Sequence, residues 1–190
     1  MRDVQEEDFV LGDVLCLRKK EVHFGTEMAP SVILYDPRYI HNIGCVIRSL
    51  SCFGGKAVLF TGERILSLLK DPTLGKRGKR FPREERMKGY QDIRIIHDDY
   101  PLTRFSSKVV PVAVEVRDHA EELPNFVHPQ NAVYIFGPED GSLSQTILRL
   151  CQRFVVIPSR YCLNLGHAVS IVLYDRIVKL GITRSDFIIS

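Results

Sequence analysis

The chain has 190 residues, 45% of them hydrophobic and 26% charged, and a formal net charge of +3 at pH 7. This composition is typical of a globular domain with its own core, and no apolar run reaches the roughly 18 residues that a membrane span requires, so we expect no membrane partner. The first residues, Met1 to Asp8, are acidic and polar rather than signal-like, so we predict a cytoplasmic protein.

Cysteine usage argues against disulfides and metals. The five cysteines are odd in number, and they form neither a CxxC pair nor a Cys/His cluster at zinc spacing. We therefore expect reduced thiols and no metal site.

The chain opens with a segment of mixed character. Met1 to Pro30 predicts little beyond a short strand within Phe9 to Leu17, so we treat residues 1–30 as an N-terminal extension and residues 31–190 as the main domain.

The main domain alternates short apolar runs with stretches of helical spacing. Strands are predicted at Ser31–Tyr35, Lys56–Phe60, Ile93–Ile96, Val109–Val114, Asn131–Phe136 and Phe154–Ile157. Helices are predicted at His41–Phe53, Arg64–Leu69, Ala120–Leu123, Leu143–Cys151 and Asn164–Val178, with Asn42 and Asn164 as N-caps of the first and last. This alternation predicts an α/β fold whose mostly parallel sheet has helices on both faces.

The last helix has apolar residues on more than one side, which predicts burial over most of its surface. The loop before it is therefore held between a buried strand and a buried helix. Such a loop is either a ligand-binding loop or an ordinary connection.

Three loops are expected to converge, because ligands of parallel sheets lie beyond the carboxyl ends of the strands. They are Asp36–Arg48, Gly137–Ser144 and Pro158–His167. The second contains Glu139 and Asp140, which disfavour a phosphate and favour a neutral or cationic ligand, although such a turn is also common without any ligand.

Positive charge is concentrated between Lys76 and Lys88, where seven basic residues face two acidic ones. This local excess predicts contact with a polyanion, and a solvated linker is the alternative.

Three stretches together resemble a known family: NIGCVIR (from Asn42 to Arg48), FGPEDGSLS and IPSRYCLNLGHAVSIVLYD. In order and spacing they are similar to the three motifs of the SpoU/TrmH-type RNA ribose methyltransferases of the SPOUT superfamily. The resemblance extends over roughly Ser31 to Leu180.

That resemblance implies a fold and an activity. The fold is an α/β sheet with a C-terminal deep trefoil knot, an exception to the rule that chains are not knotted. The activity is transfer of a methyl group from S-adenosylmethionine to a ribose 2′-hydroxyl of tRNA or rRNA. The active site is expected to be completed across a homodimer.

The resemblance also assigns residues. Arg48, Asn42, Glu139 and Asn164 correspond to the catalytic group, and the cofactor is expected to contact Val114, Gly137, Ile157, Cys162 and Leu163. Contacts with the RNA backbone are expected from Lys76, Arg77, Lys79, Arg80, Arg83 and Arg86. Because a guanidinium with a pKa above about 12 resists deprotonation, we expect Arg48 to hold the target phosphate and orient the hydroxyl; the alternative is an ordinary surface arginine.

Two positions depart from the family pattern. Ser142 stands where glycine is usual, and Cys162 where serine is usual, which leaves open a non-catalytic RNA-binding protein that has lost turnover. A base methyltransferase is a third possibility. His167 either contacts substrate or caps the last helix.

Overall fold

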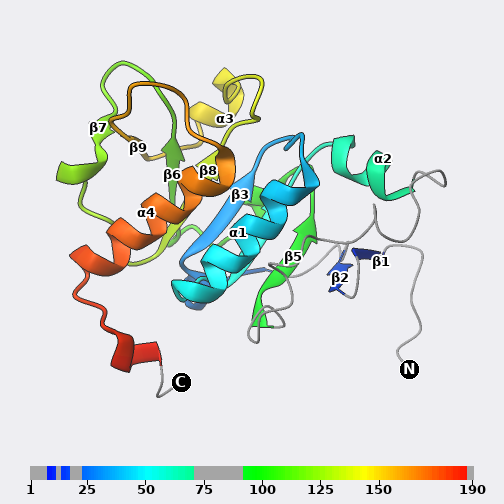
Figure 1. Ribbon diagram of the computed structural model, residues 1–190, viewed down its shortest axis with the longest axis horizontal. Coiled ribbons are helices and arrows are strands. Elements are labelled where there is room, and N and C mark those ends of the chain that lie inside the picture. The colour runs from blue at the N-terminus through cyan, green and yellow to red at the C-terminus, as the bar shows by residue number, and fades with distance from the viewer. Residues whose placement is uncertain (1–7, 12–13, 18–22, 71–91, 188–190) are drawn as a thin grey trace.

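A nine-stranded sheet runs through the computed structural model, which describes residues 8–11, 14–17, 23–70 and 92–187 (Figure 1). The strand order is β1-β2-β5-β4-β3-β8-β6-β9-β7. Only the edge strand β1 runs antiparallel to its neighbour, and the other described pairings are parallel. The carboxyl ends of the parallel strands therefore lie at one edge of the sheet.

Six strands match the apolar runs predicted between Ser31 and Ile157, the one strand expected within Phe9–Leu17 is two (β1 and β2), and the short acidic β7 was not predicted. Their bounds are Asp8–Leu11 (β1), Val14–Leu17 (β2), Ser31–Leu34 (β3), Ala57–Phe60 (β4), Arg94–His97 (β5), Val110–Val114 (β6), Glu121–Glu122 (β7), Ala132–Phe136 (β8) and Arg153–Val156 (β9). Every residue of β3, β4 and β8 is buried, as expected for central strands covered on both faces.

The helices divide between the two faces. The long helices α1 (Ile40–Cys52) and α4 (Leu165–Lys179) lie side by side on one face (Figure 1). The other helical segments are α2 (Arg64–Lys70), α3 (Gln145–Leu148) and the 3₁₀ turns η1 (Thr26–Met28), η4 (Pro101–Arg104), η5 (Leu123–Asn125) and η6 (Arg184–Phe187). None of the helices in the described part of the chain is long and apolar enough to cross a membrane.

The core has one cluster on each face of the sheet. In β3, Val32 and Leu34 pack with α1 and α4, while Ile33 joins Phe24 and Leu148 on the opposite face. That opposite face is covered by α3 and 3₁₀ turns instead of long helices. The expected α/β fold with a mostly parallel sheet is confirmed, while the knot and the domain boundary at residue 31 stay predictions.

Three local predictions are wrong. Helix α1 begins at Ile40 with Tyr39 as its N-cap, so Asn42 lies inside the helix, where its side chain is free to make a tertiary contact. Ala120–Leu123 is no helix, because β7 pairs with β9 there and the proline of η5 follows directly. Leu143–Cys151 shortens to Gln145–Leu148, because the chain must reach β9 at Arg153.

Helix α4 is anchored at both ends. The Asn164 side chain accepts hydrogen bonds from the backbone N–H groups of Gly166 (2.9 Å) and His167 (3.4 Å), which confirms it as N-cap. Near the other end, the buried Arg176 guanidinium donates to the carbonyls of Pro129 (3.2 Å) and Gln130 (2.7 Å).

The outer surface of α4 differs from expectation. Ile171, Tyr174 and Val178 are 38%, 58% and 57% exposed, so the helix is not buried over most of its surface. Their spacing places them along one stripe of the helix. Among the described residues, the Tyr174 ring lies against the Phe53 ring, with centroids 6.0 Å apart, and the stripe is otherwise an exposed apolar face.

Helices α1 and α4 approach closely at Gly166. A Cβ atom at this position would lie 2.7 Å from the Cβ of Cys45, so the crossing requires glycine. The hydroxyls of Ser49 and Ser170 meet at 2.6 Å across the same pair of helices. This contact fixes the start of α4 against α1, which positions the groups described next.

Candidate active site

A chain of hydrogen bonds joins the three loops that were expected to converge, which confirms that expectation. The Glu139 carboxylate accepts from the backbone N–H of Arg38 (2.7 Å) and from the Asn42 side-chain amide (2.5 Å). The Asn164 amide donates to the Asn42 oxygen at 2.9 Å. All three loops therefore take part.

The donor and acceptor roles in this chain of hydrogen bonds are set by Glu139. An ionised carboxylate only accepts hydrogen bonds, so Glu139 orients the NH₂ group of Asn42 toward itself. The Asn42 oxygen then faces Asn164, which must donate with its own NH₂ group. This leaves the Asn164 oxygen free to cap α4. Asn42 is fully buried, so an unpaired amide there would be costly.

Ion pairs hold the same loops from the outside. Arg64, the first residue of α2, contacts Asp36 (2.9 Å) and Asp140 (2.7 Å). The hydrogen bond from Arg64 lowers the pKa of the Asp140 carboxyl. These groups are partly exposed, so each pair contributes little stability alone.

The backbone makes a tight turn at Gly62, next to Asp36 of these ion pairs. Gly62 has φ +77°, and a Cβ atom there would lie 2.2 Å from the Asp36 carboxylate. Both the left-handed backbone and the close approach therefore require glycine at this position.

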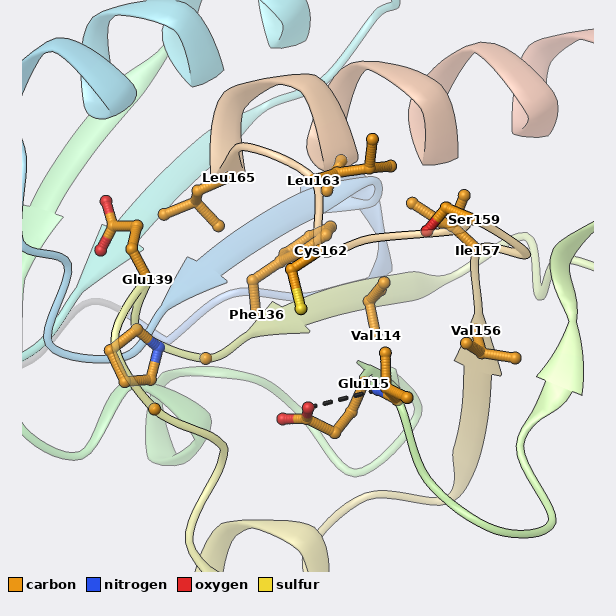
Figure 2. Close-up of a pocket in the computed structure, with 15 residues that line it drawn as sticks. Val114, Glu115, Phe136, Glu139, Val156, Ile157, Ser159, Cys162, Leu163 and Leu165 are labelled. Carbon is orange, nitrogen blue, oxygen red and sulfur yellow. Dashed lines mark hydrogen bonds between the residues drawn. The ribbon is translucent and has the colours of Figure 1, made fainter.

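A pocket of about 740 Å³, counted to its open mouth, lies at the carboxyl ends of β6, β8 and β9 and beneath the loop that leads into α4 (Figure 2). Its apolar lining comprises Val114, Val116, Phe136, Pro138, Val156, Ile157, Leu163, Leu165 and Ala168. Gly137, Glu115, Glu139, Gly141, Ser159 and Cys162 complete it.

Glu115 was missed by the sequence analysis. Its carboxylate accepts from the backbone N–H groups of Leu143 (3.0 Å) and Val116 (3.2 Å), so it ties the second loop to the end of β6. A Cβ on Gly137 would lie 3.2 Å from the Leu143 nitrogen, which shows how tightly this corner is built. The available signal was an acidic residue directly after a predicted strand, at the edge where the other loops meet.

Eight of the predicted site residues lie at or beside the pocket. Val114, Gly137, Ile157, Cys162 and Leu163 line the pocket together with Glu139, while Asn42 and Asn164 belong to the hydrogen-bond chain beside it.

Arg48 is not among the residues that line the pocket. It is exposed on α1 and makes no hydrogen bond or ion pair within the described residues. The six basic residues from Lys76 to Arg86 lie outside the described residues.

The lining predicts the chemistry of a ligand. Apolar walls suit an aromatic or aliphatic body, and the two carboxylates suit a positive charge. The pocket lining contains no lysine, arginine or histidine among the described residues, so an anionic group would lack a partner there. No group of three or more His, Cys, Asp and Glu among the described residues is placed to hold a metal ion.

The sequence profile described as SpoU rRNA Methylase family matches residues 29–174, which include all three loops and the pocket. The chain belongs to the SpoU rRNA Methylase family. Membership confirms the resemblance found in the sequence and the class it implied, an RNA methyltransferase. A comparison with curated proteins finds no match to the sequence.

Solved structures share the SpoU fold at low sequence identity. One, from work on the 2-OH methylation of C/U34 on tRNA, is 24% identical with a TM-score of 0.62, over 80% of this chain and 95% of that one. AviRb from Streptomyces viridochromogenes, solved with AdoMet, is 20% identical with a TM-score of 0.58, over 87% of this chain and 61% of that one. The A. aeolicus TrmH/SpoU tRNA modifying enzyme is 16% identical with a TM-score of 0.60, over 82% of each chain.

Asn42→Asp tests the hydrogen-bond chain. The new carboxylate would face Glu139, and like charges raise the pKa of one of the pair above its unfolded value. The proton is then bound more tightly in the folded state, so the destabilisation is present at neutral pH and decreases as pH falls through the raised pKa. We expect the free energy of unfolding in urea to fall by about 1–3 kcal/mol at pH 7.

The loss relative to wild type should shrink as the pH is lowered toward 4. His167→Ala, an exposed change in the first turn of α4, is the matched control and should stay within about 0.5 kcal/mol of wild type. An Asn42→Asp deficit that is the same at every pH would contradict the assigned contact with Glu139.

Proposed function

We propose that the chain transfers a methyl group from S-adenosylmethionine to a ribose 2′-hydroxyl of tRNA or rRNA. The observation that carries the proposal is the pocket itself, because the family's three motifs meet there through Glu139, Asn42 and Asn164. AviRb has been solved with AdoMet, and another neighbour is an RNA 2′-O ribose methyltransferase.

The pocket fits the cofactor. Phe136, Ile157 and Leu165 offer apolar surface to an adenine ring, and Glu115 and Glu139 offer negative charge to a sulfonium and an ammonium group. Gly137 lets the backbone approach a ligand closely. Bound S-adenosylmethionine supplies an activated methyl group; the protein's part is to orient it and exclude water.

The departures from the family pattern are compatible with this fit. Ser142 does not line the pocket. Cys162 does, and its small side chain leaves the backbone groups at this position able to contact a ligand. Binding through backbone groups therefore survives both substitutions. His167 donates its backbone N–H to Asn164, so its ring is not needed as the helix cap.

Arg48 has a positioning role in this proposal. Its guanidinium stays protonated, so it binds the phosphate beside the target ribose and orients the 2′-hydroxyl for attack. Since Arg48 does not line the pocket of its own chain, we assign it to the pocket of a second copy. The apolar stripe of Ile171, Tyr174 and Val178 supplies a face for that homodimer. The basic residues Lys76 to Arg86 hold the RNA backbone.

The target atom is tested with paired substrates. An RNA that the wild-type protein methylates is resynthesised with 2′-deoxyribose at the modified position, and methyl incorporation is measured by mass spectrometry. We expect no transfer to the deoxy substrate. Continued methylation would identify a base methyltransferase, and cofactor binding without transfer to any RNA in total cellular RNA would identify a protein that has lost turnover.

Arg48→Ala tests the positioning role. Loss of phosphate and hydroxyl orientation should lower kcat by about 10²-fold or more, while the Kd for S-adenosylmethionine stays near the wild-type value. Arg149→Ala, an exposed arginine outside the pocket lining, is the matched control and should leave both quantities unchanged. A large loss of cofactor affinity in Arg48→Ala would show that Arg48 builds the pocket of its own chain.

Ile171→Glu with Val178→Glu tests the dimer. Burying two new carboxylates at the interface should convert a dimer into a monomer in light scattering, with cofactor binding retained and methyl transfer lost. Val127→Glu, a 74% exposed position away from the stripe, is the control. A wild-type protein that is monomeric at assay concentration yet active would contradict the shared site.

A further inference from the structure

Two exposed tyrosines with basic partners lie in segments that adjoin the pocket. Tyr39 is 42% exposed, its ring is stacked on His41 with centroids 5.4 Å apart, and the Arg38 guanidinium lies 5.3 Å from the ring centre. Tyr161 is 73% exposed, and the Arg160 guanidinium lies 5.3 Å from its ring centre.

Both tyrosines lie next to pocket residues. Tyr161 is between Ser159 and Cys162, which line the pocket, and the Ser159 hydroxyl donates to the Tyr161 carbonyl at 2.9 Å. Arg38, directly before Tyr39, donates its backbone N–H to the pocket residue Glu139. The two segments are joined by the Asn164–Asn42 hydrogen bond, so both tyrosines belong to segments that meet at one site.

Neither tyrosine ring belongs to the core, so core packing does not explain why an aromatic residue stands at these two positions. Each guanidinium lies over its ring, so the uncovered part of the exposed ring can stack on a base while the cation offers a positive charge to a phosphate. Arg160 forms no ion pair within the described residues, so its charge is available, whereas Arg38 also lies 3.5 Å from Asp140. The loop of Tyr161 is held by Ser159, which reduces the entropy lost when a ligand orders it.

We propose that Tyr39 and Tyr161 stack on unpaired nucleobases next to the target nucleotide, with Arg160 contacting a phosphate. This rests on the proposed function and narrows its substrate class to RNA that is single-stranded at the target, such as a loop. A paired helix keeps its bases stacked on one another and offers no free π-face.

The test measures RNA affinity by fluorescence anisotropy with a labelled stem-loop RNA as probe and the fully paired duplex as competitor. Tyr39→Ala and Tyr161→Ala should each weaken binding by about fivefold to a hundredfold, while the Phe variants keep wild-type affinity. Tyr100→Ala, a 76% exposed tyrosine that follows β5, is the matched control. The duplex should compete poorly.

Salt dependence separates stacking from charge. The slope of log Kd against log salt counts phosphate contacts, so it should be unchanged in the tyrosine variants and smaller by roughly 0.7 in Arg160→Ala. A fall in affinity with an altered slope in Tyr161→Ala would show that the ring supports a cation and does not stack.

Other results overturn the inference. In the variants, they are wild-type RNA affinity after alanine substitution, equal losses of RNA affinity in the Phe and Ala variants, or a changed mass of the protein assembly in Tyr161→Ala. In the wild type, they are failure to bind the stem-loop, or competition by the duplex as strong as that by the unlabelled stem-loop. The proposed function fails separately: wild-type protein that binds the stem-loop through these rings but transfers no methyl group to any RNA would refute catalysis and leave stacking intact.

Discussion

The side-chain amide of Asn42 is the interaction on which the site depends. It donates to Glu139 after β8 and accepts from Asn164 before α4, so one buried group connects three loops that are far apart in sequence. Because Glu139 can only accept, the direction of every bond in the chain is fixed, including the cap of α4. The pocket wall formed by the loop after β9 is thereby held against the wall formed after β8.

The parallel sheet explains why the chemistry gathers at one edge. Strands β6, β8 and β9 all end at the pocket, and Glu115, Glu139 and Cys162 follow those ends closely in sequence. The opposite end of α4 is fixed by Arg176 and the carbonyls of Pro129 and Gln130, away from the site. A rigid frame thus carries short loops, which is the arrangement that positions a small ligand with little loss of entropy on binding.

Much of this was predictable because the strands are short apolar runs and the motifs are local. Asn164 was recognised as a cap from its place before an apolar helix, but Asn42 was misread as one, since its tertiary partner Glu139 is 97 residues away. Glu115 acts through backbone N–H groups that a sequence does not reveal. The exposed stripe on α4 was hidden because apolar residues look alike whether they face a core or a partner. The first motif identified Arg48 as a site residue. That Arg48 does not line the pocket of its own chain depends on how the chain packs, which the motif does not reveal.

We expect the pocket between β6, β8, β9 and the loop before α4 to bind S-adenosylmethionine. Calorimetric titration of the cofactor into the wild-type protein and into Ala168→Phe, which fills the pocket from α4, tests this expectation most directly. We expect one binding site per chain in the wild type and loss of that binding in the filled variant, whose circular dichroism spectrum should show that the fold is retained. Absence of binding by the wild type at millimolar cofactor, or undiminished binding by Ala168→Phe, would contradict this expectation.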